Sequence, residues 1–76
     1  RQLELIRQLE ERHGLGFLPD DLLTAAKARL ANPDYSLKEL GEIMIPPLGK
    51  SGMNHRLKKL ERIAGEMLGQ LREDDK

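Results

Sequence analysis

The segment richest in chemically active side chains is KSGMNHRLKKLER, residues 50–62. Five Lys or Arg residues stand there against one Glu, which gives the segment a charge of +4. The whole chain has a formal net charge of zero, because the remaining residues hold eight basic and twelve acidic side chains. A neutral chain that concentrates its positive charge in one segment is predicted to meet a polyanion there, and nucleic acid is the obvious class.

The same segment also offers a nucleophile and a base at helical spacing. Ser51 and His55 are four residues apart, so their side chains would be neighbours on a helix. A catalytic pair also needs an orienting group and an enclosed pocket, and the sequence suggests neither. The two His residues and the carboxylates lack the spacing of a metal site. We therefore expect no enzyme, no metal and no other cofactor.

The composition predicts an all-α fold. The chain has 15 Leu and no Val, and Phe17 and Tyr35 are its only aromatic residues. Residues with branched β-carbons favour strands, and this chain contains few of them: Ile6, Thr24, Ile43, Ile45 and Ile63. A length of 76 residues suits one small domain. We expect a small helical bundle.

Composition also bears on location. The chain has no Cys, which is compatible with a reducing compartment. No apolar run approaches the roughly 18 residues of a membrane span, and no signal-peptide pattern opens the chain. We expect a cytoplasmic, nucleoid-associated protein with no membrane partner. Because the sequence begins at Arg1 and not at Met, we expect a fragment of a longer protein.

Two helices are predicted in the first half of the chain. Residues 2–12 form an amphipathic helix, and Gly14 supplies a left-handed stop. Its apolar side consists of Leu3, Leu5, Ile6 and Leu9. A loop over residues 14–19 leads to a second helix that begins near Pro19, since proline suits a first helical turn. Asn-Pro-Asp at residues 32–34 ends this helix.

A short third helix is predicted over residues 37–44. Ser36 and Glu39 have the spacing of a capping box, in which each side chain bonds the backbone N–H of the other residue. The residues expected to face inward are Leu37, Leu40, Ile43 and Met44. Gly41 costs about 1 kcal/mol inside a helix, which suggests that another helix approaches it closely. The Pro-Pro pair within residues 45–50 then forces a turn.

The last predicted helix covers residues 51–71. Its apolar residues recur at spacings of 4, 3, 4, 3 and 4, a regular stripe of Met53, Leu57, Leu60, Ala64, Met67 and Leu71. At about 100° per residue, the side opposite this stripe carries Ser51, His55, Lys59 and Arg62, with Lys58 close by. If the stripe is buried, the basic residues face solvent.

These elements predict one helix-turn-helix domain within residues 1–76. Residues 36–44 are its first helix, residues 45–50 its turn, and residues 51–71 its recognition helix and extension. Four side chains at the start of the recognition helix suit the edges of bases: Ser51, Asn54, His55 and Arg56. Four others suit phosphates: Lys50, Lys58, Lys59 and Arg62.

Other interpretations of the same residues stay open. A charged outer face can be merely solvated, Asn54 can be a local hydrogen-bonding residue at the helix start, and His55 can be an ordinary surface residue. A basic amphipathic helix can also dock into an acidic groove of a protein. A protein-interaction module, bound to RNA polymerase or to another domain, is therefore the alternative to DNA binding.

Two runs, NPDYSLKELGEIM and PPLGKSGMNHRLKKL, carry a more specific resemblance. Together with the sequence between residues 2 and 68, they resemble the C-terminal domain of the WhiA family of bacterial developmental transcription regulators. The resemblance implies a helix-turn-helix fold similar to region 4 of sigma factors and specific binding to double-stranded promoter DNA. It also implies a missing N-terminal domain related to LAGLIDADG homing endonucleases, and regulation of sporulation, division or chromosome segregation genes.

The resemblance implies roles and partners as well. In the relatives, the KSGMNHR-like run opens the recognition helix, which places at the DNA Lys50, Ser51, Asn54, His55 and Arg56. Partners implied at the promoter are an RNA polymerase sigma factor and WhiB-type iron–sulfur proteins. The chain departs from many relatives at Gly49, where they have Ser, a better helix cap. Its turn is also longer than that of ordinary sigma-type domains.

Overall fold

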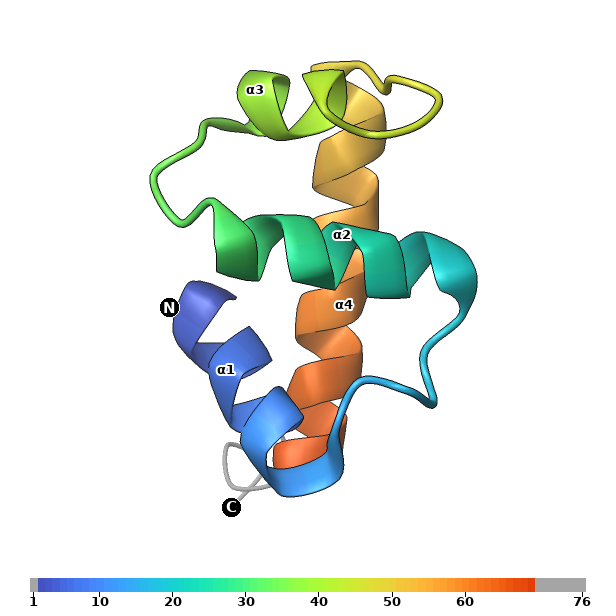
Figure 1. Ribbon diagram of the computed structural model, residues 1–76. Helices are drawn as coiled ribbons and strands as arrows, with labels where there is room; N and C mark the ends of the chain where they lie inside the picture. The colour runs from blue at the N-terminus through green and yellow to red at the C-terminus, as the bar shows by residue number, and fades with distance from the viewer. Residues whose placement is uncertain (1, 70–76) are drawn as a thin grey trace.

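The described part of the chain folds into four helices joined by short loops (Figure 1). The computed structural model describes residues 2–69. The helices are α1 (Gln2–His13), α2 (Asp20–Ala31), α3 (Leu37–Glu42) and α4 (Lys50–Leu68). No strand occurs in residues 2–69. The predicted all-α bundle is therefore confirmed.

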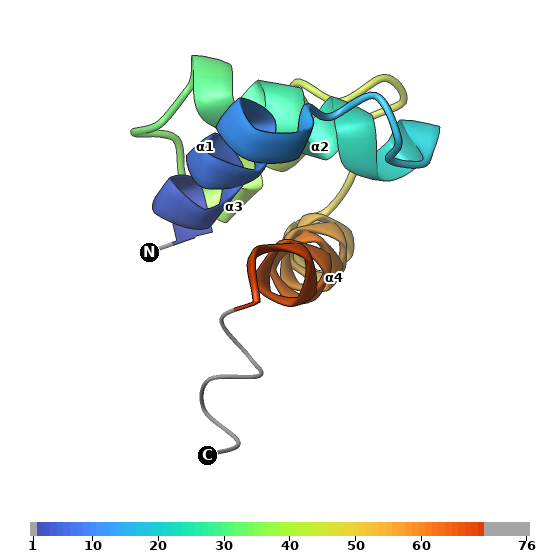
Figure 2. The same ribbon diagram turned by 90° about the horizontal axis from the view of Figure 1, so that it is seen from below.

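The long helix α4 is the element on which the others assemble. Each of α1, α2 and α3 packs against it, and α2 also contacts both α1 and α3. Seen along α4, the other three helices lie on one side of it (Figure 2). The core between them consists of completely or almost completely buried side chains: Ile6, Leu9, Leu22, Ala25, Ala26, Leu40, Met53, Leu57, Leu60 and Ala64.

The loop between α1 and α2 ends α1 and contributes two residues to the core. Gly14 adopts a left-handed conformation with φ of 73°, and its N–H donates to the Glu10 carbonyl at 3.0 Å, so the predicted stop is confirmed. Leu15 and Leu18 of the loop are 7% and 5% exposed and belong to the core. These two core residues lie outside any periodic segment, so the helical pattern does not identify them.

The predicted capping box starts α3. The Ser36 N–H donates to Glu39 Oε1 at 2.8 Å, and the Glu39 N–H donates to Ser36 Oγ at 3.2 Å. The helix ends at Glu42, two residues before the predicted end. There, the N–H groups of Ile43 and Met44 donate three residues back, to Leu40 and Gly41, and not four. This tighter turn shifts the helical register, so Met44 is buried while Ile43 is 44% exposed and the prediction that it faces inward is wrong.

Gly41 is the point of closest approach between α3 and the turn. The Leu48 N–H donates to the Gly41 carbonyl at 2.8 Å. A Cβ atom at Gly41 would overlap the Leu48 carbonyl oxygen and lie 3.1 Å from its carbonyl carbon. A close neighbour was predicted here, but that neighbour is the backbone of the turn and not another helix. The contact places the end of the turn, and hence the start of α4, against α3.

Helix α4 begins without a side-chain cap and ends at a glycine. Gly49 is its N-cap, and Gly69 adopts a left-handed φ of 79° after Leu68. The predicted continuation to Leu71 lies outside the described residues. Met67 was predicted to join the buried stripe, but it is 41% exposed. A repeat of 3.5 residues drifts by about 20° per heptad on a straight helix. Because Met67 lies two heptads beyond Met53, this drift turns it away from the buried side of α4.

We predict that Gly41→Ala destabilises the domain by about 2 kcal/mol or more, because the new methyl group would displace the Leu48 backbone. Gly16→Ala is the matched control. A Cβ atom at Gly16 meets nothing within 4 Å and needs no unusual φ. Urea unfolding monitored by circular dichroism gives the free energy of unfolding of each variant. Equal values for the two variants would contradict the close contact.

We also predict that Gly49→Ser stabilises the domain by a few tenths of a kcal/mol. Gly49 has φ of −73° and ψ of 172°, close to the −73° and 169° of Ser36, which already caps α3. A Cβ atom at Gly49 meets nothing within 4 Å, so a Ser side chain can accept a hydrogen bond from the first turn of α4. The same unfolding assay should show a loss of about 1 kcal/mol for Ser36→Ala. A loss of stability in Gly49→Ser would show that the start of α4 differs from the start of α3.

Candidate nucleic-acid interface

The rotation of α4 decides which side chains can reach a partner. Met53, Leu57 and Leu60 are 0% exposed and hold one side of the helix against α1, α2 and α3. The opposite side is exposed and carries polar and basic residues, Ser51, His55, Lys58, Lys59 and Arg62, while Lys50 is exposed in the first turn of the helix. The predicted orientation of α4 is therefore confirmed. Asn54 and Arg56 are half-buried on its two flanks.

Four of these side chains line one open hollow, called here the cationic hollow. It has a volume of about 370 Å³ and is lined by His55, Lys58, Lys59 and Arg62. Their spacings of three and four residues place them on one face of the helix. Within the part of the chain that the structure describes, no hydrogen bond or ion pair ties any of the four to an acidic residue. Three positive charges therefore face solvent together, beside the imidazole of His55.

The single acidic residue of the basic segment is turned away from the hollow. The Gln2 side chain of α1 donates a hydrogen bond to Glu61 Oε2. Glu61 is half-buried on that side of α4 and does not line the cationic hollow. The arrangement keeps the Glu61 carboxylate from pairing directly with the cations of the hollow. Sequence periodicity places Glu61 near the apolar stripe but does not identify Gln2 as its partner.

Arg56 lies apart from the other predicted base-reading residues. It lines a second hollow, of about 230 Å³, that lies beside the first turn of α2. Its neighbours there are Asp20, Asp21 and Thr24 of α2, and Met44, Ile45 and Pro46 of the turn. The sequence places Arg56 on the flank of the basic surface, but it does not show that two carboxylates face the same space.

The start of α4 adds a fixed partial charge. The first N–H groups of a helix have no partner inside the helix, and Gly49 offers no side chain to accept from them. Lys50 and Ser51 in this first turn are exposed. The positive end of the helix and Lys50 thus lie together at the surface, an arrangement that attracts phosphate.

The described residues also bear on metal binding and on the possible Ser51–His55 pair. In residues 2–69, no three His, Cys, Asp or Glu side chains are grouped so that they could hold a metal ion. Ser51 does not line the hollow that contains His55, so the possible nucleophile–base pair has no shared pocket. None of the helices in the described range is long and apolar enough to cross a membrane.

Comparison with known proteins gives consistent matches. The family described as the WhiA C-terminal HTH domain matches residues 1–64. A probable cell division protein WhiA from Clostridium acetobutylicum is 55% identical over 67 residues, which cover 88% of this chain and 21% of that protein. A protein of the same name from Thermoanaerobacter pseudethanolicus is 49% identical over 67 residues, with the same coverage.

A solved structure agrees with the fold. The crystal structure of full-length DUF199/WhiA from Thermatoga maritima superposes with a TM-score of 0.77 at 38% identity. The match covers 86% of this chain and 22% of that one. The chain thus spans about a fifth of the length of the proteins that it matches.

Proposed function

The chain belongs to the family of WhiA C-terminal helix-turn-helix domains, and we propose that it binds specific sites in duplex promoter DNA. In this proposal, α4 is the recognition helix and lies in the major groove. The observation that carries it is the orientation of α4, which buries its Met and Leu side chains and exposes its cations. A groove between two rows of phosphates suits such a helix in both shape and charge.

The geometry of α3 and α4 supports this role. Helix α3, the turn and α4 follow one another as the two helices and turn of a helix-turn-helix, and α3 packs directly on α4. The contact between Gly41 and Leu48 holds the turn against α3. In Figure 1, the first turns of α4 lie beside α3 and the turn, at one end of the molecule. In this motif, the N-terminal residues of the second helix reach the base edges.

We divide the site residues into two classes by chemistry. The phosphate class consists of Lys50, Lys58, Lys59 and Arg62, because a point charge suffices for a phosphate. The base-edge class consists of Ser51, Asn54, His55 and Arg56, because their side chains can donate or accept directed hydrogen bonds. Asn54 suits adenine, which it can bind through two hydrogen bonds. Arg56 suits guanine, but it lines a hollow together with Asp20 and Asp21.

The role of the longer protein follows from the family. We propose that this chain is the DNA-binding part of a transcription regulator that acts on cell division or sporulation genes. An RNA polymerase sigma factor and WhiB-type proteins stay predicted partners at the promoter. The chain covers about a fifth of its relatives, so contacts of this kind can involve residues outside it.

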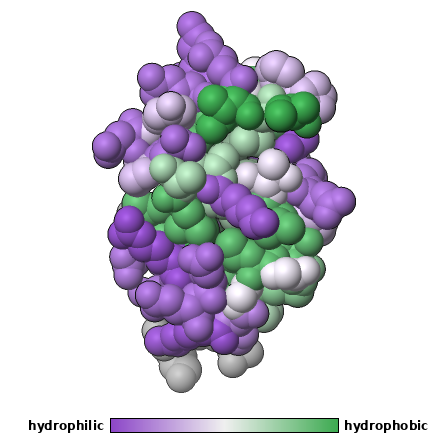
Figure 3. Space-filling view, in the orientation of Figure 1, coloured by the Kyte–Doolittle hydropathy of each residue, from purple (hydrophilic) through white to green (hydrophobic). Residues whose placement is uncertain are grey.

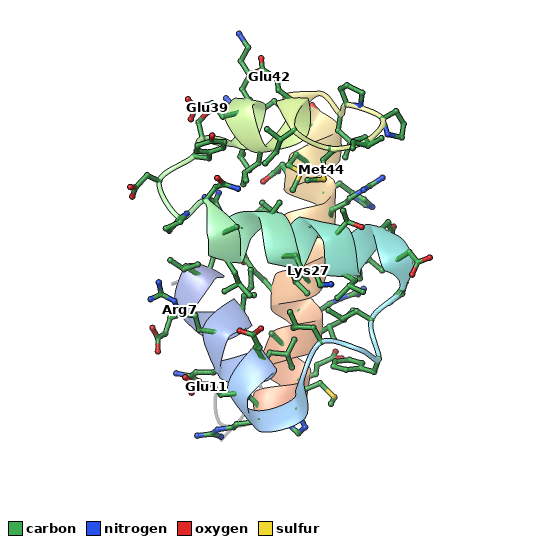
Figure 4. The ribbon with its side chains drawn as sticks, viewed as in Figure 1. Arg7, Glu11, Lys27, Glu39, Glu42 and Met44 are labelled. Atoms are coloured by element: carbon green, nitrogen blue, oxygen red, sulfur yellow. The ribbon has the colours of Figure 1, made fainter. Side chains whose placement is uncertain are left out.

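We predict that Lys59→Gln weakens binding to every duplex by a similar factor. Loss of one phosphate contact should also reduce the slope of log K against log salt by about 0.9. Fluorescence anisotropy on promoter and scrambled duplexes across a salt series measures both effects. Lys27→Gln is the matched control, since Lys27 is exposed on α2 and lies away from the outward face of α4 (Figure 4). An unchanged slope for Lys59→Gln would remove Lys59 from the phosphate class.

We predict that Asn54→Ala costs about 1–3 kcal/mol on the cognate duplex and relaxes the preference for it. Arg56→Ala should have the same kind of effect but a smaller one, because Arg56 lines a hollow with Asp20 and Asp21, whose negative charge favours its present position. Competition between the cognate duplex and duplexes with single base changes separates the two residues. Equal losses on cognate and scrambled DNA would move either residue to the phosphate class.

A further inference from the structure

The turn before α4 exposes a run of apolar side chains that the proposed DNA contact does not use. Ile45 is 95% exposed and Ile43 is 44% exposed, and the two prolines that follow are also exposed. Met44 between them is only 4% exposed and anchors the run to the core. Figure 3 shows hydrophobic side chains gathered at the upper edge of the molecule, over α3 and the turn. A branched aliphatic side chain with almost no protein contact gains much from a partner that covers it.

Met44, Ile45 and Pro46 of this run form one wall of the hollow that also contains Arg56. The wall opposite it belongs to the first turn of α2, with Asp20, Asp21 and Thr24. The Thr24 hydroxyl donates to the Asp20 carbonyl, and Asp21 Oδ1 accepts from the Leu22 N–H at 2.9 Å. The Asp20 carboxylate has no hydrogen-bond partner within residues 2–69. Two carboxylates against one guanidinium leave this hollow with an excess of one negative charge.

The net negative charge of this hollow indicates that its occupant is not DNA. The carboxylates of Asp20 and Asp21 would repel phosphates, and an aliphatic side chain cannot bind them. The hollow also shares no lining residue with the cationic hollow. The two surfaces therefore differ in both composition and sign of charge.

We infer that the turn and the first turn of α2 form a docking surface for a protein segment that presents an aliphatic side chain beside Lys or Arg. The aliphatic side chain covers Ile45 and Pro46, and the basic group pairs with Asp20 and Asp21. Because this surface and the cationic hollow share no lining residue, the chain can hold such a segment while the residues of the cationic hollow contact DNA. Arg56 lines the docking hollow, so an occupant there would compete with its proposed base contact. The inference goes beyond the proposed DNA binding and stands without it.

Selection from a library of short random peptides displayed on phage tests the inference. The 76-residue chain is the target, and the Ile45→Ser variant serves for counter-selection. We expect enriched peptides that share an aliphatic residue next to Lys or Arg. Such peptides, once synthesised, should bind Ile45→Ser and Asp20→Asn at least about tenfold more weakly than the parent chain, a change that fluorescence anisotropy resolves.

Controls separate this surface from the fold and from DNA. Ile45 has almost no contacts, so Ile45→Ser should unfold at the same temperature as the parent. Phe17→Ser removes another exposed apolar side chain, on the loop before α2, and should leave peptide binding unchanged. Failure to enrich any peptide over the Ile45→Ser target, or enrichment of acidic peptides, would overturn the inference. A loss of DNA affinity in Ile45→Ser would assign Ile45 to the DNA interface and would also overturn the inference. Weak DNA binding by the parent chain would contradict only the proposed function.

Discussion

The burial of one side of α4 is the constraint on which the rest of the structure depends. Met53, Leu57, Leu60 and Ala64 are completely buried, and the helices that cover them come from every other part of the chain. A rotation of α4 by one residue would turn it through about 100° and would expose this side. Truncation of a buried Leu to Ala costs about 2–5 kcal/mol, much of the stability of a domain of this size. The rotation of α4, and hence the direction of its cations, is therefore held by packing and not by the cations themselves.

A second constraint sets where α4 begins. The glycine at position 41 allows the Leu48 backbone to lie against α3, closer than any side chain would permit. The capping box of Ser36 and Glu39 fixes the other end of α3. A helix of six residues is too short to be stable alone, so α3 depends on its cap, on this contact and on Leu40 in the core. These contacts hold α3 against the turn and against α4.

Much of this arrangement could be predicted from local sequence. The capping box, the left-handed Gly14 and the orientation of the α4 stripe each depend on residues a few positions apart, and the structure confirms all three. The errors occurred where geometry departs from the ideal helix. Ile43 is exposed because α3 tightens at its last turn, and Met67 is exposed because the 3.5-residue repeat drifts along a straight helix.

Contacts between distant segments were not predictable in the same way. Leu15 and Leu18 enter the core from a loop with no periodic pattern. The pairing of Gln2 with Glu61, and the position of Arg56 beside Asp20, join residues that are 59 and 36 positions apart. Nothing in the spacing of either partner points to the other. For the candidate interface, the sequence thus gives the types of side chain and the face of the helix, while the division into two hollows requires the fold.

The two hollows show how positive and negative charge are distributed in a chain whose net charge is zero. The basic segment that opens α4 holds +4, and the other residues together hold −4. Within the described residues, the cationic hollow lies on the side of α4 that faces away from the other helices, while Asp20 and Asp21 lie where α2 meets the turn. A polyanion that approaches such a molecule is attracted by one side and repelled by others, so its field favours one orientation before any contact forms. A uniformly basic domain of the same size would attract a polyanion to many faces, so the proposed contact through α4 would be less favoured over the others.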